Sequence, residues 1–177
     1  MNRSAIKPFA RLLGPALALS ALAIPGPAFA ATVSDTFQVS ITIQKACSVT
    51  ANASADIDLG TVASTATNTT GSGTVTVTCS KTTPYYIGLA PSNANTAGAG
   101  TMAGTGGNTD TVPYQLSSTA GPSGTVWGNT ATASAVGNGV SGTGTGSSQT
   151  LTIYVTAPSA NYTPDTYTDT VTINVHY

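Results

Sequence analysis

Charge is scarce in this sequence of 177 residues, which contains five lysine and arginine residues and six acidic residues. Three of the basic residues, Arg3, Lys7 and Arg11, fall within the first eleven positions. The rest of the chain keeps Lys45 and Lys81 against six aspartates, a formal charge of −4. Two cations cannot neutralise a row of phosphates, so this composition argues against nucleic acid and anionic membrane surfaces as partners.

Histidine is nearly absent, since His176 is the only one and lies one residue before the end of the sequence. No Ser/His/Asp or Cys/His arrangement therefore has a scaffold. Asp56 and Asp58 share a face if their segment is a strand, but a Ca²⁺ site needs more ligands and a glycosidase pair needs a buried, tuned acid. Solvated or turn-capping aspartates are the better interpretation. We expect no catalytic residues, no metal site and no cofactor, and we predict that the protein is not an enzyme.

Long apolar runs are also missing, because no stretch reaches the about 20 residues that a membrane-spanning helix needs. The apolar run at 12–24 is interrupted by Gly14 and Pro15, follows the basic start and precedes Ala28-Phe29-Ala30, a small-x-small cleavage site. This order is typical of a secretion signal. We expect residues 1–30 to be a signal peptide, residues 31–44 an N-terminal strand, and residues 45–177 one domain large enough to bury a core.

Cysteine occurs only twice, at Cys47 and Cys79. In an exported, oxidising compartment we expect the two to form a disulfide bond that ties the first predicted strand to the third. Two reactive free thiols are the alternative, but neither cysteine has a neighbouring histidine or a CxxC partner to activate it. Closing this loop of about 32 residues stabilises the fold by about 3.7 kcal/mol in the chain-entropy model.

Helical periodicity is absent after residue 30, because no stretch shows sustained apolar spacing at i, i+3, i+4 and i+7. Short runs separated by turn residues are instead typical of an all-β, immunoglobulin-like sandwich. We expect strands at 37–50, 57–62, 73–79, 85–89, 112–117, 151–156 and 167–177, with a weaker one at 125–127. The Gly-rich segments 91–110 and 128–148 are predicted surface loops, each holding a short edge strand or a functional surface.

Apolar and polar residues alternate at both ends of the chain that follows the signal. Near the start the apolar row is Val33, Phe37, Val39, Ile41 and Ile43, and only Asp35 interrupts it. Side chains alternate between the faces of a strand, so all five apolar groups project from one side. The last residues repeat the pattern with Val171, Ile173, Val175 and Tyr177. Periodicity alone does not decide whether the first row pairs within its own domain or with another molecule.

Several short segments, taken in order, carry a family resemblance. They are the alternating strand that ends at Cys47, then Ile57-Asp58-Leu59-Gly60-Thr61, Val75-Thr76-Val77-Thr78-Cys79, Tyr86-Ile87-Gly88-Leu89, Pro113-Tyr114-Gln115-Leu116, and the ending at 167–177. Their order, the cysteine spacing and the terminal tyrosine resemble the spore coat U domain family, which includes the major subunits of archaic chaperone-usher pili. The match covers nearly the whole chain after the signal.

The resemblance implies an incomplete immunoglobulin-like sandwich, which lacks its final strand and therefore has a hydrophobic groove. A periplasmic chaperone would fill this groove first, and the N-terminal strand of a neighbouring copy or related subunit would replace it at an outer-membrane usher. The chain would then be a structural pilus subunit, exported through the periplasm to a fimbrium on the cell surface that supports adhesion and biofilm formation.

The same resemblance assigns roles to the two alternating rows. The donor side chains are Val33, Phe37, Val39, Ile41 and Ile43, and one wall of the acceptor groove consists of Val171, Ile173, Val175 and Tyr177. Asp35 departs from the donor pattern and marks a position at the mouth of the groove or outside it.

Two other functions stay open from the sequence. A spore or cell coat protein would use the same fold. A secreted carbohydrate-binding adhesin domain would use the Gly-rich loops, or stack sugars on Trp127, Tyr85, Tyr86, Tyr114 and Tyr154. Aromatic side chains of a sandwich more often pack in the core or the groove, and we expect that role for these five.

Overall fold

The computed structural model describes residues 29–177, which divide into two units that are described separately. Residues 29–41 belong to the first unit, and residues 42–177 form the second. The described part of the first unit contains no helix and no strand, and its large apolar side chains are exposed, from Val33 at 93% to Val39 at 84%. The predicted signal peptide lies almost wholly outside the described residues.

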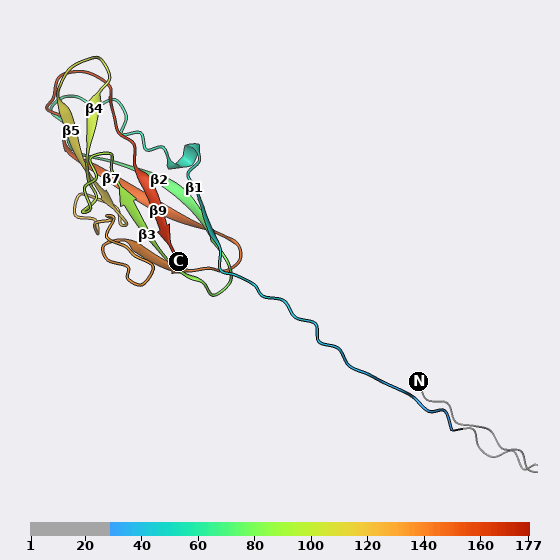
Figure 1. Ribbon diagram of the computed structural model, residues 1–177. Helices are drawn as coiled ribbons and strands as arrows, with labels where there is room; N and C mark the ends of the chain where they lie inside the picture. The colour runs from blue at the N-terminus through green and yellow to red at the C-terminus, as the bar shows by residue number, and fades with distance from the viewer. Residues whose placement is uncertain (1–28) are drawn as a thin grey trace, which may run out of the picture. The chain divides into compact units, whose positions relative to one another are not determined.

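The second unit consists of nine strands in two sheets (Figure 1). The strands are β1 Cys47–Thr50, β2 Thr67–Cys79, β3 Pro84–Ala90, β4 Ala99–Gly104, β5 Thr111–Ser117, β6 Val140–Thr143, β7 Ser148–Ser159, β8 Tyr167–Thr168 and β9 Thr172–His176, and one 3₁₀ turn spans Ala53–Ala55. The larger sheet has the order β1-β2-β7-β5-β4-β8 and the smaller sheet β6-β3-β9, with every pairing antiparallel. No helix of the described residues is long and apolar enough to cross a membrane.

The core lies between the inner faces of the two sheets, where every second side chain of the long strands is buried. In β2 these are Val75, Val77 and Cys79. Trp127 is also fully buried, and its indole Nε1–H donates to the carbonyl oxygen of Ile87 at 2.8 Å, so its one polar group is satisfied. The remaining buried members of the core are Tyr85, Ile87, Leu89, Tyr114, Leu116, Ile153 and Val155. The prediction of an all-β, immunoglobulin-like sandwich is confirmed.

Four predicted strands, at 73–79, 85–89, 112–117 and 151–156, lie within β2, β3, β5 and β7. The Gly-rich segments 91–110 and 128–148 contain the short strands β4 and β6, which was one of the two expected outcomes. The weak strand at 125–127 is reduced to one isolated bridge, between Val126 and Ser117.

Three strand predictions were wrong in extent or existence. Residues 37–46 have no strand, so only Cys47–Thr50 of the first predicted strand forms. Residues 57–62 have none because no neighbouring strand pairs with them. The final strand is broken into β8 and β9 between Asp169 and Val171, where the Asp169 carboxylate accepts the amide N–H of Thr170 at 2.8 Å.

The disulfide between Cys47 and Cys79 is formed, as predicted, with the two Cα atoms 4.1 Å apart. Both cysteines lie at one register position of the antiparallel pair β1–β2. The bond therefore joins neighbouring first and second strands rather than the first and third, because the expected strand between them does not exist. Beyond it the amide N–H of Ser80 donates to the carbonyl oxygen of Ala46 at 2.9 Å, which extends the pairing by one residue.

Candidate groove between the sheets

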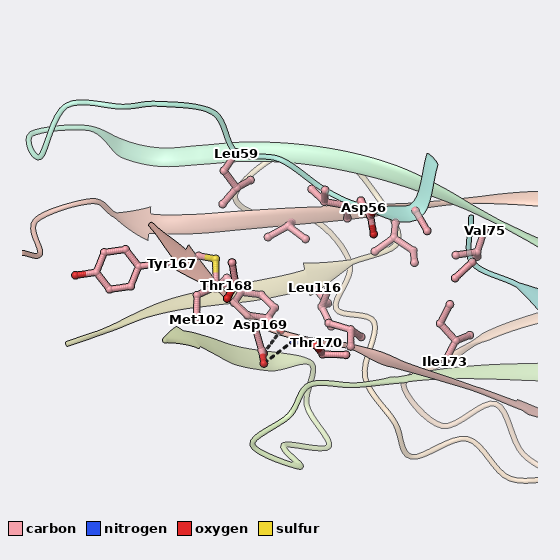
Figure 2. Close-up of a pocket in the computed structure, with 17 residues that line it drawn as sticks. Asp56, Leu59, Val75, Met102, Leu116, Tyr167, Thr168, Asp169, Thr170 and Ile173 are labelled. Atoms are coloured by element: carbon pink, nitrogen blue, oxygen red, sulfur yellow. Dashed lines mark hydrogen bonds between the residues drawn. The ribbon is translucent and has the colours of Figure 1, made fainter. Parts of the chain in front are cut away.

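An apolar cavity of about 370 Å³ lies within the second unit (Figure 2). The inner face of the large sheet lines it with Val75, Met102, Tyr114, Leu116, Ile153 and Val155. The rest of the lining comes from two segments of the chain. One is residues 51–59, represented by Ala51, Ala55, Asp56, Ile57 and Leu59, and the other is the C-terminal segment with Tyr167, Thr168, Asp169, Thr170, Val171 and Ile173.

The C-terminal side of this cavity is an open sheet edge, because β9 pairs with β3 on one side and with no other strand of the described residues. The register places Leu89 of β3 opposite Ile173, yet the amide N–H of Leu89 donates to the carbonyl oxygen of Gly128 at 2.9 Å. Leu89 and Ile173 are thus a non-hydrogen-bonded pair of the antiparallel ladder. Alternation along the ladder then directs the backbone groups of Ile173 and Val175 toward the open edge.

The other side of the cavity is an extended segment without strand partners. In the described part of the chain, no backbone hydrogen bond involves residues 56–59, although the side chains of Ile57 and Leu59 pack against the core. The segment crosses β2 where two glycines leave room for it. A Cβ atom on Gly71 would lie 2.8 Å from Ile57 Cγ2, and one on Gly73 would lie 2.8 Å from the carbonyl oxygen of Ala55. The cavity is therefore flanked by unpaired backbone on both sides.

The two aspartates of this segment do not form a buried pair. Asp56 and Asp58 are both exposed, and the Asp58 carboxylate accepts the amide N–H of Gly60 at 2.7 Å, so it caps a turn. Within residues 29–177, no three His, Cys, Asp or Glu side chains gather where they could hold a metal ion.

One polar pair lies in the cavity wall, where the hydroxyl of Tyr114 donates to Asp169 Oδ2 at 2.6 Å. The Tyr114 ring covers Gly100 of the neighbouring strand, where any larger side chain would overlap it. Burial, and then the hydrogen bond and charge of Asp169, raise the pKa of Tyr114 well above its ordinary value. Burial alone would raise the pKa of Asp169, but hydrogen bonds from Ser92, Tyr114 and Thr170 outweigh it and lower that pKa. Figure 2 shows this carboxylate at the cavity with its hydrogen bonds.

The structure brings together only part of the predicted acceptor wall. Val171 and Ile173 line the cavity. Val175 lies further along β9 and packs against the core, and Tyr177 follows the strand with 46% of its surface exposed. The assignment of all four to an acceptor groove stays a prediction.

The predicted donor side chains lie outside the folded strands of the chain. All five are exposed, including Phe37 at 88% and Ile43 at 82%. Their role as donors is likewise still a prediction.

Sequence reasoning missed most of the cavity. Leu116, Ile153 and Val155 line the cavity from the large sheet, but the sequence assigned them to strands and not to a site. The alternation of Ile153 and Val155 along their strand does indicate one shared face.

Of the aromatic residues weighed as a sugar-binding surface, Trp127, Tyr85 and Tyr114 are buried in the core, as expected. Tyr86 and Tyr154 are only half-buried and belong to neither the core nor the cavity lining, so the expectation was wrong for these two. Each alternates with buried neighbours and therefore lies on the outer face of its strand.

An all-β sandwich with an apolar cavity and an open sheet edge beside it is the class of protein that this geometry defines. The family model described as Spore Coat Protein U domain matches residues 33–174. The chain therefore belongs to the Spore Coat Protein U domain family.

The solved structures that the chain matches include a chaperone–tip adhesion subunit pre-assembly complex, CsuC–CsuE, from archaic chaperone-usher Csu pili of Acinetobacter baumannii. This match has a TM-score of 0.49 and a sequence identity of 20%, and it covers 77% of this chain and 40% of the matched chain. A chaperone–tip adhesin complex of CFA/I fimbriae biogenesis matches with a TM-score of 0.43 at 12% identity, over 73% and 42%. The chain thus spans less than half the length of either match. No curated protein matches it.

Proposed function

We propose that this chain is a structural pilus subunit that polymerises by donor-strand complementation. In this proposal the apolar row at 33–43 of one copy fills the cavity of the next and pairs with the open edge of β9. A periplasmic chaperone holds the groove before assembly, and an outer-membrane usher is the site of exchange. The polymer is exported to the cell surface, where it supports adhesion and biofilm formation.

The observation that carries this proposal is the cavity of about 370 Å³ beside the unpaired backbone of β9. Strand addition of this kind draws affinity from backbone hydrogen bonds and specificity from alternate side chains that fill pockets. The backbone groups of Ile173 and Val175 face the open edge, and the alternation in 33–43 supplies the side chains.

The free energy gained by burying the row favours a long-lived contact between copies. Burying one Val, Ile or Phe side chain stabilises by about 1.5–3 kcal/mol, so the five exposed side chains of the row contribute on the order of 10 kcal/mol before backbone pairing is counted. Without a partner, the same five side chains form an exposed apolar stripe, and such a stripe is typical of an interaction surface.

Gel electrophoresis of the full-length exported chain tests the proposal. We expect a ladder of oligomers on unheated denaturing gels, which collapses to monomer on boiling because the subunits are held without covalent bonds. Phe37→Asp and Ile41→Asp should remove the ladder while leaving the chaperone-bound subunit intact, because the folded domain does not use these side chains. Gln38→Asp is the matched control, since it adds the same charge on the opposite face of the row and should leave the ladder unchanged.

A stable monomer at high concentration without a chaperone would contradict the proposal. So would loss of folding, rather than loss of the ladder, in Phe37→Asp, since that outcome means the row pairs within its own domain. A coat protein would show the same ladder, and immunogold labelling of the polymer on fibres or in a coat layer separates these two roles.

A permuted chain provides a second test of the groove. If residues 31–44 are moved from the start to a position after Tyr177, joined through a short turn, the row can run antiparallel to β9 of its own copy. We expect this permuted chain to fill its own groove and to be a folded monomer.

A further inference from the structure

The two lysines outside the predicted signal peptide lie at one end of the second unit. Lys45 precedes Ala46 and Lys81 follows Ser80, and the backbones of Ala46 and Ser80 are hydrogen-bonded to each other. Continuing the antiparallel register of β1 and β2 places the two lysines opposite each other. Both side chains are exposed. We call this the basic end, which also receives the end of β9, because His176 pairs with Tyr86 just after the β2–β3 connection.

Two of the six aspartates lie at the other end of the unit. Asp110 and Asp165 belong to two loops that are joined at the opposite end of the sandwich, where Thr163 donates to Asp110 and Gly106 donates to Asp165. This acidic end lies beside the start of β2, since Thr67 pairs with Ser159 while Thr78 pairs with Ser148. The 13 residues of β2 separate the two ends by about 40 Å at 3.2–3.4 Å per residue.

This separation leaves both lysines of the described chain without an ion-pair partner in their own domain. A distance of about 40 Å is several times the Debye length of about 8 Å at physiological ionic strength, so the two ends do not attract each other within one copy. Opposite charges at opposite ends are complementary only between copies arranged end to end.

The charges also distinguish the two directions in which a strand could enter the groove. β9 runs from the acidic end toward the basic end. A donor that runs antiparallel to β9 brings its own Lys45 to the acidic end of the acceptor. The ten residues from Lys45 back to Asp35 span about 33 Å of the about 40 Å between the two ends, so Asp35 comes near the basic end. A parallel donor places Lys45 against lysines and Asp35 against aspartates, and both contacts are repulsive.

We propose that opposite charges fix the contact between successive copies: Lys45 of the donor lies against Asp110 and Asp165 of the acceptor, and Asp35 of the donor against Lys81. The inference rests on the proposed polymerisation, with the donor antiparallel to β9, and adds the residues of the contact. It gives Asp35, the one polar interruption of the donor row, a partner at the mouth of the groove.

Zero-length cross-linking tests this arrangement in fibres sheared from producing cells. A water-soluble carbodiimide joins a lysine amine to a carboxylate only when the two groups touch. We expect covalent dimers that survive boiling, with Lys45 joined to Asp110 or Asp165 and Lys81 joined to Asp35 in their peptides. A link from Lys45 to Asp110 must join two copies, because these residues lie at opposite ends of one domain.

Two other outcomes are decisive. Heat-labile fibres without any of these lysine links overturn the inference, while the proposed function stands. Absence of heat-labile polymer contradicts the proposed function itself, and the inference falls with it.

Charge reversal provides an independent measurement. Asp35→Lys and Lys81→Glu should each slow the appearance of the oligomer ladder by about tenfold at low ionic strength, with the difference lost in high salt. The double variant should restore the rate, because the opposite charges face each other again. Lys81→Arg keeps the charge and should assemble like the unchanged chain. If the double variant is as slow as the two single effects combined, Asp35 and Lys81 do not meet.

Discussion

At the scale of single residues, the cavity wall depends on the hydrogen bond between Tyr114 and Asp169. The phenol ring is buried against Gly100, and its hydroxyl reaches a carboxylate at 2.6 Å. This bond ties β5 of the large sheet to the segment between β8 and β9, where the chain passes from one sheet to the other. A hydrogen bond to a charged group contributes about 1.5–3 kcal/mol, which is a large part of the stability of a small domain.

We predict that Tyr114→Phe in the permuted chain lowers the free energy of unfolding at neutral pH by about 1.5–3 kcal/mol. The pKa of Tyr114 is raised on folding, so its contribution is complete below the ordinary tyrosine pKa of 10.0 and decreases as pH rises above it. The variant should lack this alkaline loss. Urea unfolding at a series of pH values measures both effects.

Asp169, the partner of Tyr114, makes the stability depend on pH in the opposite direction, on the acid side. Hydrogen bonds lower the pKa of Asp169, so its stabilisation is present above the ordinary aspartate pKa of 3.8 and is lost as pH falls through the lowered value. Because Tyr114→Phe removes one of these bonds, its acid loss should be smaller. An unchanged stability and pH profile would show that the Tyr114–Asp169 bond does not hold the wall.

At the scale of elements, strands were predictable where the alternation met a neighbouring strand. The buried row Val75, Val77 and Cys79 is an example, because a central strand needs a continuous apolar face. Residues 57–62 and 37–46 show comparable patterning but form no strand, since periodicity reports the face of a strand and not its partner. The Gly-rich segments hid β4 and β6 because small side chains leave no apolar pattern to read.

The candidate site was less predictable than the fold for a related reason. Val171 and Ile173 could be found because they continue an alternating row to the end of the chain. The opposite wall, with Ile57 and Leu59, depends on a segment that crosses β2 over Gly71 and Gly73. Such a crossing is a property of the packed sheets and has no signal within one short window of sequence.

We predict that Ile173→Asp abolishes accumulation of the subunit in the periplasm. The change places an unpaired carboxylate in the cavity wall, at the residue whose backbone faces the open edge of β9. Thr172→Asp is the matched control, because the neighbouring side chain is exposed, and it should accumulate normally. Immunoblots of periplasmic extracts measure both, and normal levels of Ile173→Asp would show that this face is not covered in the cell.

At the scale of the whole molecule, the chain combines a groove flanked by unpaired backbone with a separate apolar row of matching alternation. In the proposed polymer, the row of one copy closes the groove of the next, which buries the row and pairs the open edge of β9. The disulfide between Cys47 and Cys79 secures β1 next to the point where the row joins the domain, so force along a fibre would reach β2 through a covalent bond.

The molecular mass in solution of the native and permuted chains, measured side by side by sedimentation, tests the central claim most directly. The native chain after signal cleavage should form polymers whose masses are multiples of the subunit, because each row fills the groove of another copy. The permuted chain should sediment as one folded monomer, because its row is next to its own groove. A native chain that is monomeric at high concentration, or a permuted chain that polymerises like the native one, would contradict the account.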